Sequence, residues 1–171
     1  MRVYQFERSL WLPRPRAEIF PFFADAANLN EITPPWLHFR ILTPLPIRMA
    51  PGTLIEYRIW LHGIPLRWLT EITVWDPPVR FVDRQLCGPY REWVHTHTFI
   101  ECDGGTLCTD HVRYAHAGGR WVNRWLVAPD LKRIFEYRAQ RLHELFGGKP
   151  SGHRDAVAPF AQPSTVPGGS G

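Results

Sequence analysis

Cysteine is scarce in this chain, and long apolar runs are missing altogether. Only three cysteines occur among 171 residues, namely Cys87, Cys102 and Cys108, and their spacing is not that of a zinc knuckle. A small odd number of cysteines predicts neither a disulfide framework nor a structural zinc site, and it favours a reducing compartment, which we expect to be the cytoplasm. No apolar run approaches the ~20 residues of a transmembrane helix. The amino terminus lacks the apolar core of a secretory signal, so no such signal is expected.

The motifs of several functional classes are also lacking. The chain contains no GxGxxG, no P-loop and no aromatic signature of RNA-binding domains, so we predict neither a nucleotide cofactor nor a nucleic-acid partner. The formal net charge of +4 arises in the segment 118–149, where seven basic residues stand beside three acidic ones. Because bases and acids alternate there, the segment is more typical of a solvated helix face than of a nucleic-acid surface.

Aromatic residues, in contrast, are abundant. The chain has eight Trp and ten Phe, while 44% hydrophobic and 21% charged residues are ordinary values for one soluble domain. Large rings supply much apolar area and commonly line pockets for apolar ligands. Hydrophobic periodicity ends near residue 148. We therefore expect one domain over residues 1–148 and a disordered tail, rich in Pro, Gly and Ser, over residues 149–171.

Hydrophobic periodicity predicts an ordered series of elements. A first strand at 3–12 is followed by helical patterns at 15–25, which Pro21 would kink, and at 29–33. One amphipathic helix is predicted at 129–146, with its apolar stripe laid on the sheet. Between these helices, turn signals separate six strand-like runs, which predicts an antiparallel meander with strands at 37–42, 53–62, 66–75, 79–86, 91–102 and 106–116.

A long hairpin predicted over Tyr90–Tyr114 is the most informative of these elements. Two alternating series each lie on one face of a strand, namely Trp93, His95, His97 and Phe99 on the first arm and Asp110, Val112 and Tyr114 on the second. The Asp-Gly-Gly turn at 103–105 predicts a register that places either His97 or Phe99 opposite Asp110. Such a polar and aromatic face is unusual for an ordinary core, and it could equally line a cavity.

Several local patterns carry a family resemblance when they are added to this order of elements. They are Ile32-Thr33-Pro34-Pro35, Pro51-Gly52 before a strand that bears Tyr57, the run from Trp68 to Asp83, the run from Gly88 to Phe99, the run from Asp110 to Tyr114, and the run from Ile134 to Arg138. With them the chain resembles the SRPBCC superfamily of START lipid-transfer domains, birch-pollen-type allergens and polyketide cyclases and dehydratases, and in particular a bacterial ligand-binding subfamily. Over residues 3–146 the resemblance implies an α+β helix-grip fold. This fold has a seven-stranded curved antiparallel sheet around a long C-terminal helix, two short helices after the first strand, and a hydrophobic cavity between sheet and helix.

The resemblance also implies a function for that cavity. We expect it to bind a hydrophobic or amphipathic small molecule, such as a lipid, an isoprenoid or a polyketide-like compound. The residues expected to contact this ligand are Tyr57, Trp68, Trp93, His95, His97, Phe99, Asp110, Tyr114, Ile134, Phe135 and Leu142. Asp83 could face the cavity or form a pair on the surface, and the sequence leaves both open.

Three interpretations remain open for His95, His97 and Asp110. They could act as acid and base groups, as cavity residues do in cyclases and dehydratases of this fold, and the chain would then be an enzyme. Two imidazoles and a carboxylate could also hold Fe(II) or Zn(II). An internally hydrogen-bonded patch is the commonest fate of such a cluster. We therefore expect no metal and no cofactor, and ligand binding more than catalysis.

The segment 118–127 has two interpretations as well. Trp121 and Trp125 are spaced i, i+4 beside Arg120 and Arg124, which is typical of a helix that touches a membrane surface. The interpretation that we favour is a lid packed on the domain. An interaction module that acts through the basic surface of 118–149 is a third functional hypothesis, and the oligomeric state is left open.

Overall fold

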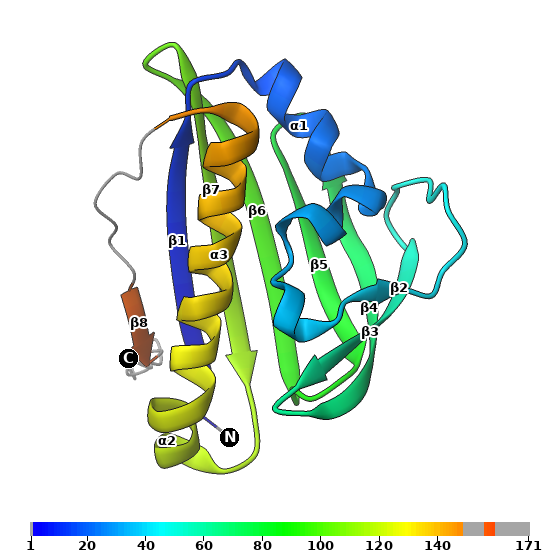
Figure 1. Ribbon diagram of the computed structural model, residues 1–171, viewed down its shortest axis with the longest axis vertical. Coiled ribbons are helices and arrows are strands. Elements are labelled where there is room, and N and C mark those ends of the chain that lie inside the picture. Colours follow the sequence, from blue (N-terminus) through cyan, green and yellow to red (C-terminus); the bar gives the residue numbers. More distant parts are fainter. Residues whose placement is uncertain (1, 149–155, 160–171) are drawn as a thin grey trace, which may run out of the picture.

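A strongly curved antiparallel sheet forms the body of the protein in the computed structural model, which describes residues 2–148 and 156–159 (Figure 1). Neighbouring strands follow the chain from β2 to β7, and β1 then closes on β7. In spatial order the strands are β2 (Arg40–Ile41), β3 (Leu54–Leu61), β4 (Ile64–Asp76), β5 (Arg80–Cys87), β6 (Glu92–Cys102), β7 (Gly105–Ala115), β1 (Tyr4–Leu12) and β8 (Ala156–Pro159). The predicted meander is therefore present.

Helices lie on the concave face of this sheet. The first group covers the side of β4 and β5, and α3 runs along β1 and β7 (Figure 1). In chain order they are α1 (Arg16–Ala24), the 3-10 helices η1 (Ala26–Ile32) and η2 (Pro35–Leu37), α2 (Gly119–Val122), the π-helical turn η3 (Asn123–Val127) and α3 (Ala128–Phe146). The α+β helix-grip prediction is confirmed. Pro21 does not divide α1, which continues through it.

The tail contributes one strand that the sequence did not predict. Ala156–Pro159 form β8, which pairs antiparallel with Tyr4–Glu7 of β1. The rest of the segment 149–171, for which the sequence predicts disorder, lies outside the described residues. The physical reason for the pairing is that β1 would otherwise be an edge strand, and an edge presents unpaired backbone groups that a returning segment can satisfy.

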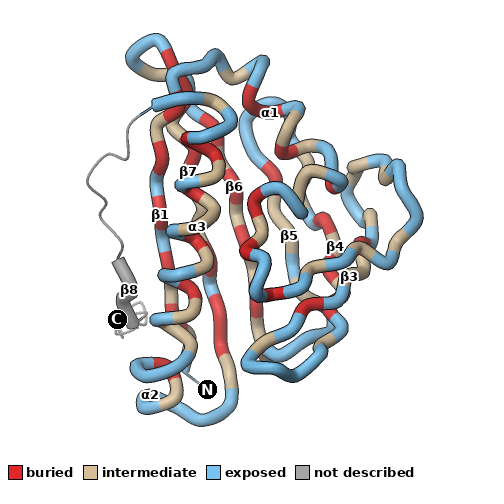
Figure 2. Tube along the Cα trace, viewed as in Figure 1, coloured by how far each residue is buried: buried red, intermediate tan, exposed pale blue. Residues whose placement is uncertain are grey.

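The hairpin β6–β7 has the predicted alternation and one of the two predicted registers. Residue His97 lies opposite Asp110, and Trp93 lies opposite Tyr114. Every second residue of β6 from Trp93 to Phe99 is buried, whereas the residues between them are not (Figure 2). The sheet therefore turns one face of this hairpin towards the helices.

An irregularity in β4 sets the direction of Trp75. Strict alternation places Trp75 on the face of Glu71 and Thr73, away from the core. The register between β4 and β5 shifts between Ile72 and Val74, and a bulge of this kind re-aims the side chains that follow it. Trp75 consequently packs on Phe20, with 5.5 Å between the ring centroids.

The helix α3 packs on the concave face of the sheet through one apolar stripe. Its buried residues are Leu131, Phe135, Ala139, Leu142 and His143, which match the predicted apolar stripe with one histidine added. Pro129 stands in its first turn directly after the π-helical turn η3, and the backbone is already helical from Gly119 through η3 into α3. Gly147 ends it with a positive φ of 83°.

The segment before α3 does not form the packed lid that the sequence favoured. Trp121 and Trp125 are 67% and 69% exposed, and the Arg124 guanidinium lies 5.4 Å from the ring centroid of Trp125. Contact of this end with a membrane surface stays a prediction. Among the described residues, no helix is long and apolar enough to span a membrane.

We predict that Phe99→Ala destabilises the protein by about 3–5 kcal/mol, because a large buried ring leaves a cavity when it is truncated. Phe99 is 1% exposed and packs on the rings of Phe20 and Phe23. Its neighbour Ile100 points outward and is 53% exposed, so Ile100→Ala is the matched control. Urea denaturation of both variants measures the difference, and equal losses would contradict the assigned strand face.

Candidate functional site

A cavity of about 200 Å³ lies between the sheet, α3 and the segment from α1 to η2. Its wall is mostly aromatic and aliphatic. The strands contribute Ile55, Tyr57, Ile59, Trp68, Ile72, Phe81 and Trp93, and the helical segments contribute Phe22, Phe23, Leu29, Ile32, Leu37, Leu131, Ile134 and Phe135. The polar groups in the wall include Thr70, Asp83, His95, His97 and Arg138. A mainly apolar wall with a few grouped polar side chains is typical of a small-molecule site.

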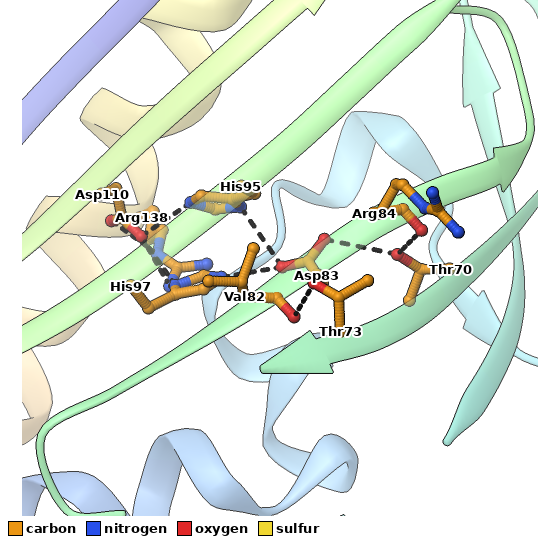
Figure 3. A network of polar contacts seen from close by, with 9 residues as sticks. All are labelled: Thr70, Thr73, Val82, Asp83, Arg84, His95, His97, Asp110 and Arg138. Carbon is orange, nitrogen blue, oxygen red and sulfur yellow. Dashed lines mark hydrogen bonds and ion pairs between the residues drawn. The ribbon is translucent and has the colours of Figure 1, made fainter. Parts of the chain in front are cut away.

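Two carboxylates and two imidazoles contact one another on the sheet side of this cavity (Figure 3). The Nε2 atom of His97 lies 2.9 Å from Asp83 Oδ2, and its Nδ1 atom lies 2.9 Å from Asp110 Oδ1. His95 reaches the same carboxylates, with Nε2 2.9 Å from Asp110 Oδ1 and Nδ1 3.8 Å from Asp83 Oδ2. The two imidazole centroids are 3.7 Å apart. Adjacent strands β5, β6 and β7 thus deliver one buried cluster.

Arg138 of α3 completes the cluster from the helix side. Its Nε and Nη2 atoms each lie 3.3 Å from an oxygen of Asp110. The same guanidinium lies 5.4 Å from the ring centroid of Phe23 and 6.0 Å from that of Phe135. Because rings surround it and Asp110 meets it at two points, the orientation of Arg138 is fixed. Asp110 is therefore held behind the imidazoles.

The cluster separates the pKa values of its members. Burial opposes ionisation of Asp110, but the Arg138 guanidinium and the hydrogen bonds from the imidazoles outweigh it and hold its pKa well below the usual range. Burial likewise opposes ionisation of Asp83, yet the His97 hydrogen bond and both imidazoles lower its pKa. Burial works against protonation of His97, but hydrogen bonds to Asp110 and Asp83 raise its pKa. Burial and the neighbouring His97 charge lower the pKa of His95. The two imidazoles therefore differ in pKa, and His97 is the one that protonates more readily.

An aromatic wall stands next to the cluster. The ring of Trp68 stacks on Tyr57 at 5.8 Å between centroids and meets Trp93 edge-on at 5.2 Å. The Trp68 indole Nε1 is buried and has no hydrogen-bond partner among the described residues. Burial, and then the charge of Asp83, raise the pKa of Tyr57, so its hydroxyl stays protonated. Both groups offer hydrogen-bond donors in an otherwise apolar wall.

A second hollow adjoins the cavity between the β3–β4 turn and the start of α3. It shares Leu37, Leu61 and Ile134 with the cavity wall. His62 Nε2 and Asp130 Oδ2, 2.6 Å apart, bridge the turn and the helix there. This side is therefore the direction in which the cavity approaches the surface.

The structure brings together most of the residues that the sequence assigned to the ligand. Tyr57, Trp68, Trp93, His95, His97, Ile134 and Phe135 all line the cavity. Asp110 does not line it, because it lies behind the imidazoles and holds them.

Three further residues that the sequence assigned to the ligand are not among those that line the cavity. Phe99, Tyr114 and Leu142 have the predicted inward direction but lie beyond the ends of the cavity. Phe99 and Leu142 pack in the core beneath α1. Tyr114 packs in the core at the opposite end and donates its hydroxyl proton to Asn123 Oδ1 at 2.9 Å. Alternation gives the face of a side chain but not its position along the strand relative to a cavity.

Two site residues escaped the sequence analysis. Asp83 was left undecided, although it is in phase with the buried Phe81 on β5. Arg138 was not assigned to the site, yet it follows Leu131 and Phe135 at i+7 and i+3 and so falls on the apolar stripe of α3. A charged residue on an otherwise apolar stripe is the signal that could have found it. The carboxylate that could join the imidazoles in holding a cation is Asp83 rather than Asp110.

We predict that His97 and His95 titrate on opposite sides of the ordinary value of 6.5, with the pKa of His97 above it and that of His95 below it. Imidazole NMR of the folded protein measures both directly. Since the pKa of His97 is raised on folding, its contribution to stability is complete below 6.5 and is lost as the pH rises through the raised value. The carboxylates that face it titrate far lower and do not contribute in this window.

The variant His97→Gln tests that sign. The difference in free energy of unfolding between this variant and the wild type should shrink as the pH rises through the raised pKa of His97. His62→Gln removes the surface imidazole paired with Asp130, and as the control it should leave the loss assigned to His97 intact. A His97 resonance that titrates below that of His95 would contradict the assignment.

Sequence and fold comparisons relate this chain to one family of known proteins. The family model described as "Polyketide cyclase / dehydrase and lipid transport" matches residues 12–142. Among curated proteins, none is detectably similar in sequence.

Solved structures share the fold at low identity. The Zhui aromatase/cyclase of Streptomyces sp. R1128 is 14% identical with a TM-score of 0.66, over 84% of this chain and 93% of that one. Protein Ms6760 of Mycobacterium smegmatis is 19% identical with a TM-score of 0.62, over 82% and 89%. The major latex-like protein 151 of Panax ginseng is 8% identical with a TM-score of 0.60, over 84% and 97%. At such identities the likeness concerns the fold alone.

Proposed function

Because this chain belongs to the polyketide cyclase/dehydrase and lipid transport family, we propose that it binds a hydrophobic or amphipathic small molecule in the cavity between its sheet and α3. One observation carries the proposal. The cavity has an apolar, largely aromatic wall, with the buried cluster of Asp83, His95 and His97 on its sheet side and further polar side chains at Asp25, Asn28 and Thr33. That division suits a ligand with an apolar body and one polar end.

The size of the cavity narrows the class of ligand. Its volume of about 200 Å³ exceeds the roughly 150 Å³ in which an apolar protein cavity binds benzene. A compound of one or two rings, or an isoprenoid segment of similar bulk, matches this space, whereas a whole diacyl lipid does not. A polyketide-like phenol has both the bulk and the polar end.

The polar end has identifiable partners. The Tyr57 hydroxyl, which stays protonated, can donate to an oxygen of the ligand. The Nδ1 atom of His95, 3.8 Å from the nearest Asp83 oxygen, is open to accept a proton from a ligand hydroxyl.

We predict that 2-naphthol and naphthalene both bind, and that Ile134→Trp weakens each by at least about tenfold because the added ring removes the apolar volume that each compound would bury. Ile134 lies on the cavity side of α3, whereas Glu136 on the same helix is exposed. Glu136→Trp is therefore the matched control. Isothermal titration calorimetry measures both probes. Equal losses in the two variants, or no binding by the wild type, would overturn the binding proposal.

The histidine variants separate the two ends of the ligand. His95→Gln should weaken 2-naphthol modestly and leave naphthalene unchanged, since only the former carries a hydroxyl. Equal effects on the two probes would place the hydroxyl elsewhere.

A second candidate function is a cyclase- or dehydratase-type reaction in the same cavity. The observation that favours it is the pair of adjacent imidazoles whose pKa values shift in opposite directions. Such a pair offers one group to take a proton and one to give a proton. His95 is the base in this hypothesis, and His97 is the acid.

The test of this second function is turnover of a β-hydroxy ketone that can lose water to form an aromatic ring. His95→Gln should lower the turnover by a factor on the order of 10²–10⁴ if it removes the base. Retained binding with unchanged turnover in both His95→Gln and His97→Gln would leave the chain a binding protein.

A further inference from the structure

Asp83, His95 and His97 are the strand residues of the buried cluster that line the cavity. Hydrogen bonds among these three side chains do not by themselves require the arrangement that they have. One ligand atom from each of Asp83, His95 and His97 lies within 4.8 Å of the other two. The Asp83 Oδ2 atom is 2.9 Å from His97 Nε2 and 3.8 Å from His95 Nδ1. Ligand atoms around a tetrahedral zinc ion, with bonds of about 2.0–2.1 Å, lie about 3.3 Å from one another. The two separations that involve Asp83 fall on both sides of that value, and the nitrogens of the two imidazoles lie within 4.8 Å of each other.

The other nitrogen of each ring supports the same point. His95 Nε2 and His97 Nδ1 both lie 2.9 Å from a single atom, Asp110 Oδ1. A histidine that binds a metal through one nitrogen usually donates the other N–H to a carboxylate, which fixes the tautomer and the ring orientation. Here one carboxylate serves both rings, and it leaves His95 Nδ1 and His97 Nε2 directed at Asp83.

Arg138 explains why the two carboxylates have different roles. It contacts both oxygens of Asp110 at 3.3 Å, so Asp110 is neutralised from behind. Among the hydrogen bonds of the described residues, Asp83 accepts from the neutral hydroxyl of Thr70 at 3.3 Å and from His97 at 2.9 Å. Asp83 is thus the carboxylate that is free of a guanidinium and turned to the cavity.

We propose that Asp83, His95 and His97 form a binding site for one divalent transition-metal ion, Zn(II) or Fe(II), with Asp110 as the outer carboxylate that orients both imidazoles. Two nitrogens and one carboxylate oxygen are a ligand set that both ions accept, and it leaves further coordination positions open. All three ligands line the cavity, so those positions face the space where a small molecule would bind. A ligand oxygen could then complete the coordination.

The experiment uses the full chain, freed of metal with a chelator and titrated with Zn(II) by calorimetry and with Co(II) by visible absorption. We expect one ion per chain and a Co(II) spectrum of four- or five-coordinate character. Asp110→Asn should weaken Zn(II) binding by about 10–100-fold, as losses of outer carboxylates do. Asp83→Asn, which keeps the size of the side chain, should weaken it further.

The control is His62→Gln, because His62 also pairs with an aspartate, Asp130, but outside the cavity. Zn(II) affinity should be unchanged in this variant. Equal affinity in Asp83→Asn and the wild type, or the absence of stoichiometric binding, would overturn the site. If a variant fails to fold, the wild type decides, since Zn(II) must shift the imidazole NMR signals of both His95 and His97. Binding of naphthalene is measured without metal, so failure of this site and failure of the binding function give separate results.

Discussion

Charge neutralisation in a buried cluster is the constraint on which the arrangement of this protein depends. Asp83 on β5, His95 and His97 on β6, Asp110 on β7 and Arg138 on α3 come from four elements and meet at one place. Removing one partner from such a cluster leaves an uncompensated charge in the interior, at a cost of about 3–5 kcal/mol. The cluster therefore fixes the register of three strands and the rotation of α3 together, because a slip in any one of them would break the pairing.

The cluster also separates two of the three apolar cores among the described residues. Along β6 the order is Trp93, then the two histidines, then Phe99, and along α3 Phe135 precedes Arg138 and Leu142 follows it. The residues before the polar position belong to one core and those after it to the other. Arg8 of β1, which lies directly across from Asp110 in the ladder, is buried at the same level. Arg8, Asp110, His95, His97 and Asp83 thus form a polar belt across neighbouring strands. His95, His97 and Asp83 of this belt line the cavity.

This division explains why the cavity suits an amphipathic ligand. The aromatic rings of Tyr57, Trp68 and Trp93 remain packed on one another and on the core, so they form a firm wall. The polar groups of the belt lie where the strands β1, β5, β6 and β7 and the helix α3 meet it. A ligand that buries its apolar body against the wall and turns an oxygen to the belt satisfies both requirements, and the same belt provides the atoms for proton transfer or for a metal.

The sequence by itself determined the order of elements, the inward faces of the β6–β7 hairpin and the apolar stripe of α3, because alternation and helical spacing are local properties of the chain. It could not give the extent of the cavity, so Phe99, Tyr114 and Leu142 were assigned to a ligand that they do not face. Only the tertiary structure decided that Asp83 and Arg138 join the histidines. Their positions depend on which strands are neighbours and on the rotation of a helix, and these follow from packing between distant segments rather than from any local pattern.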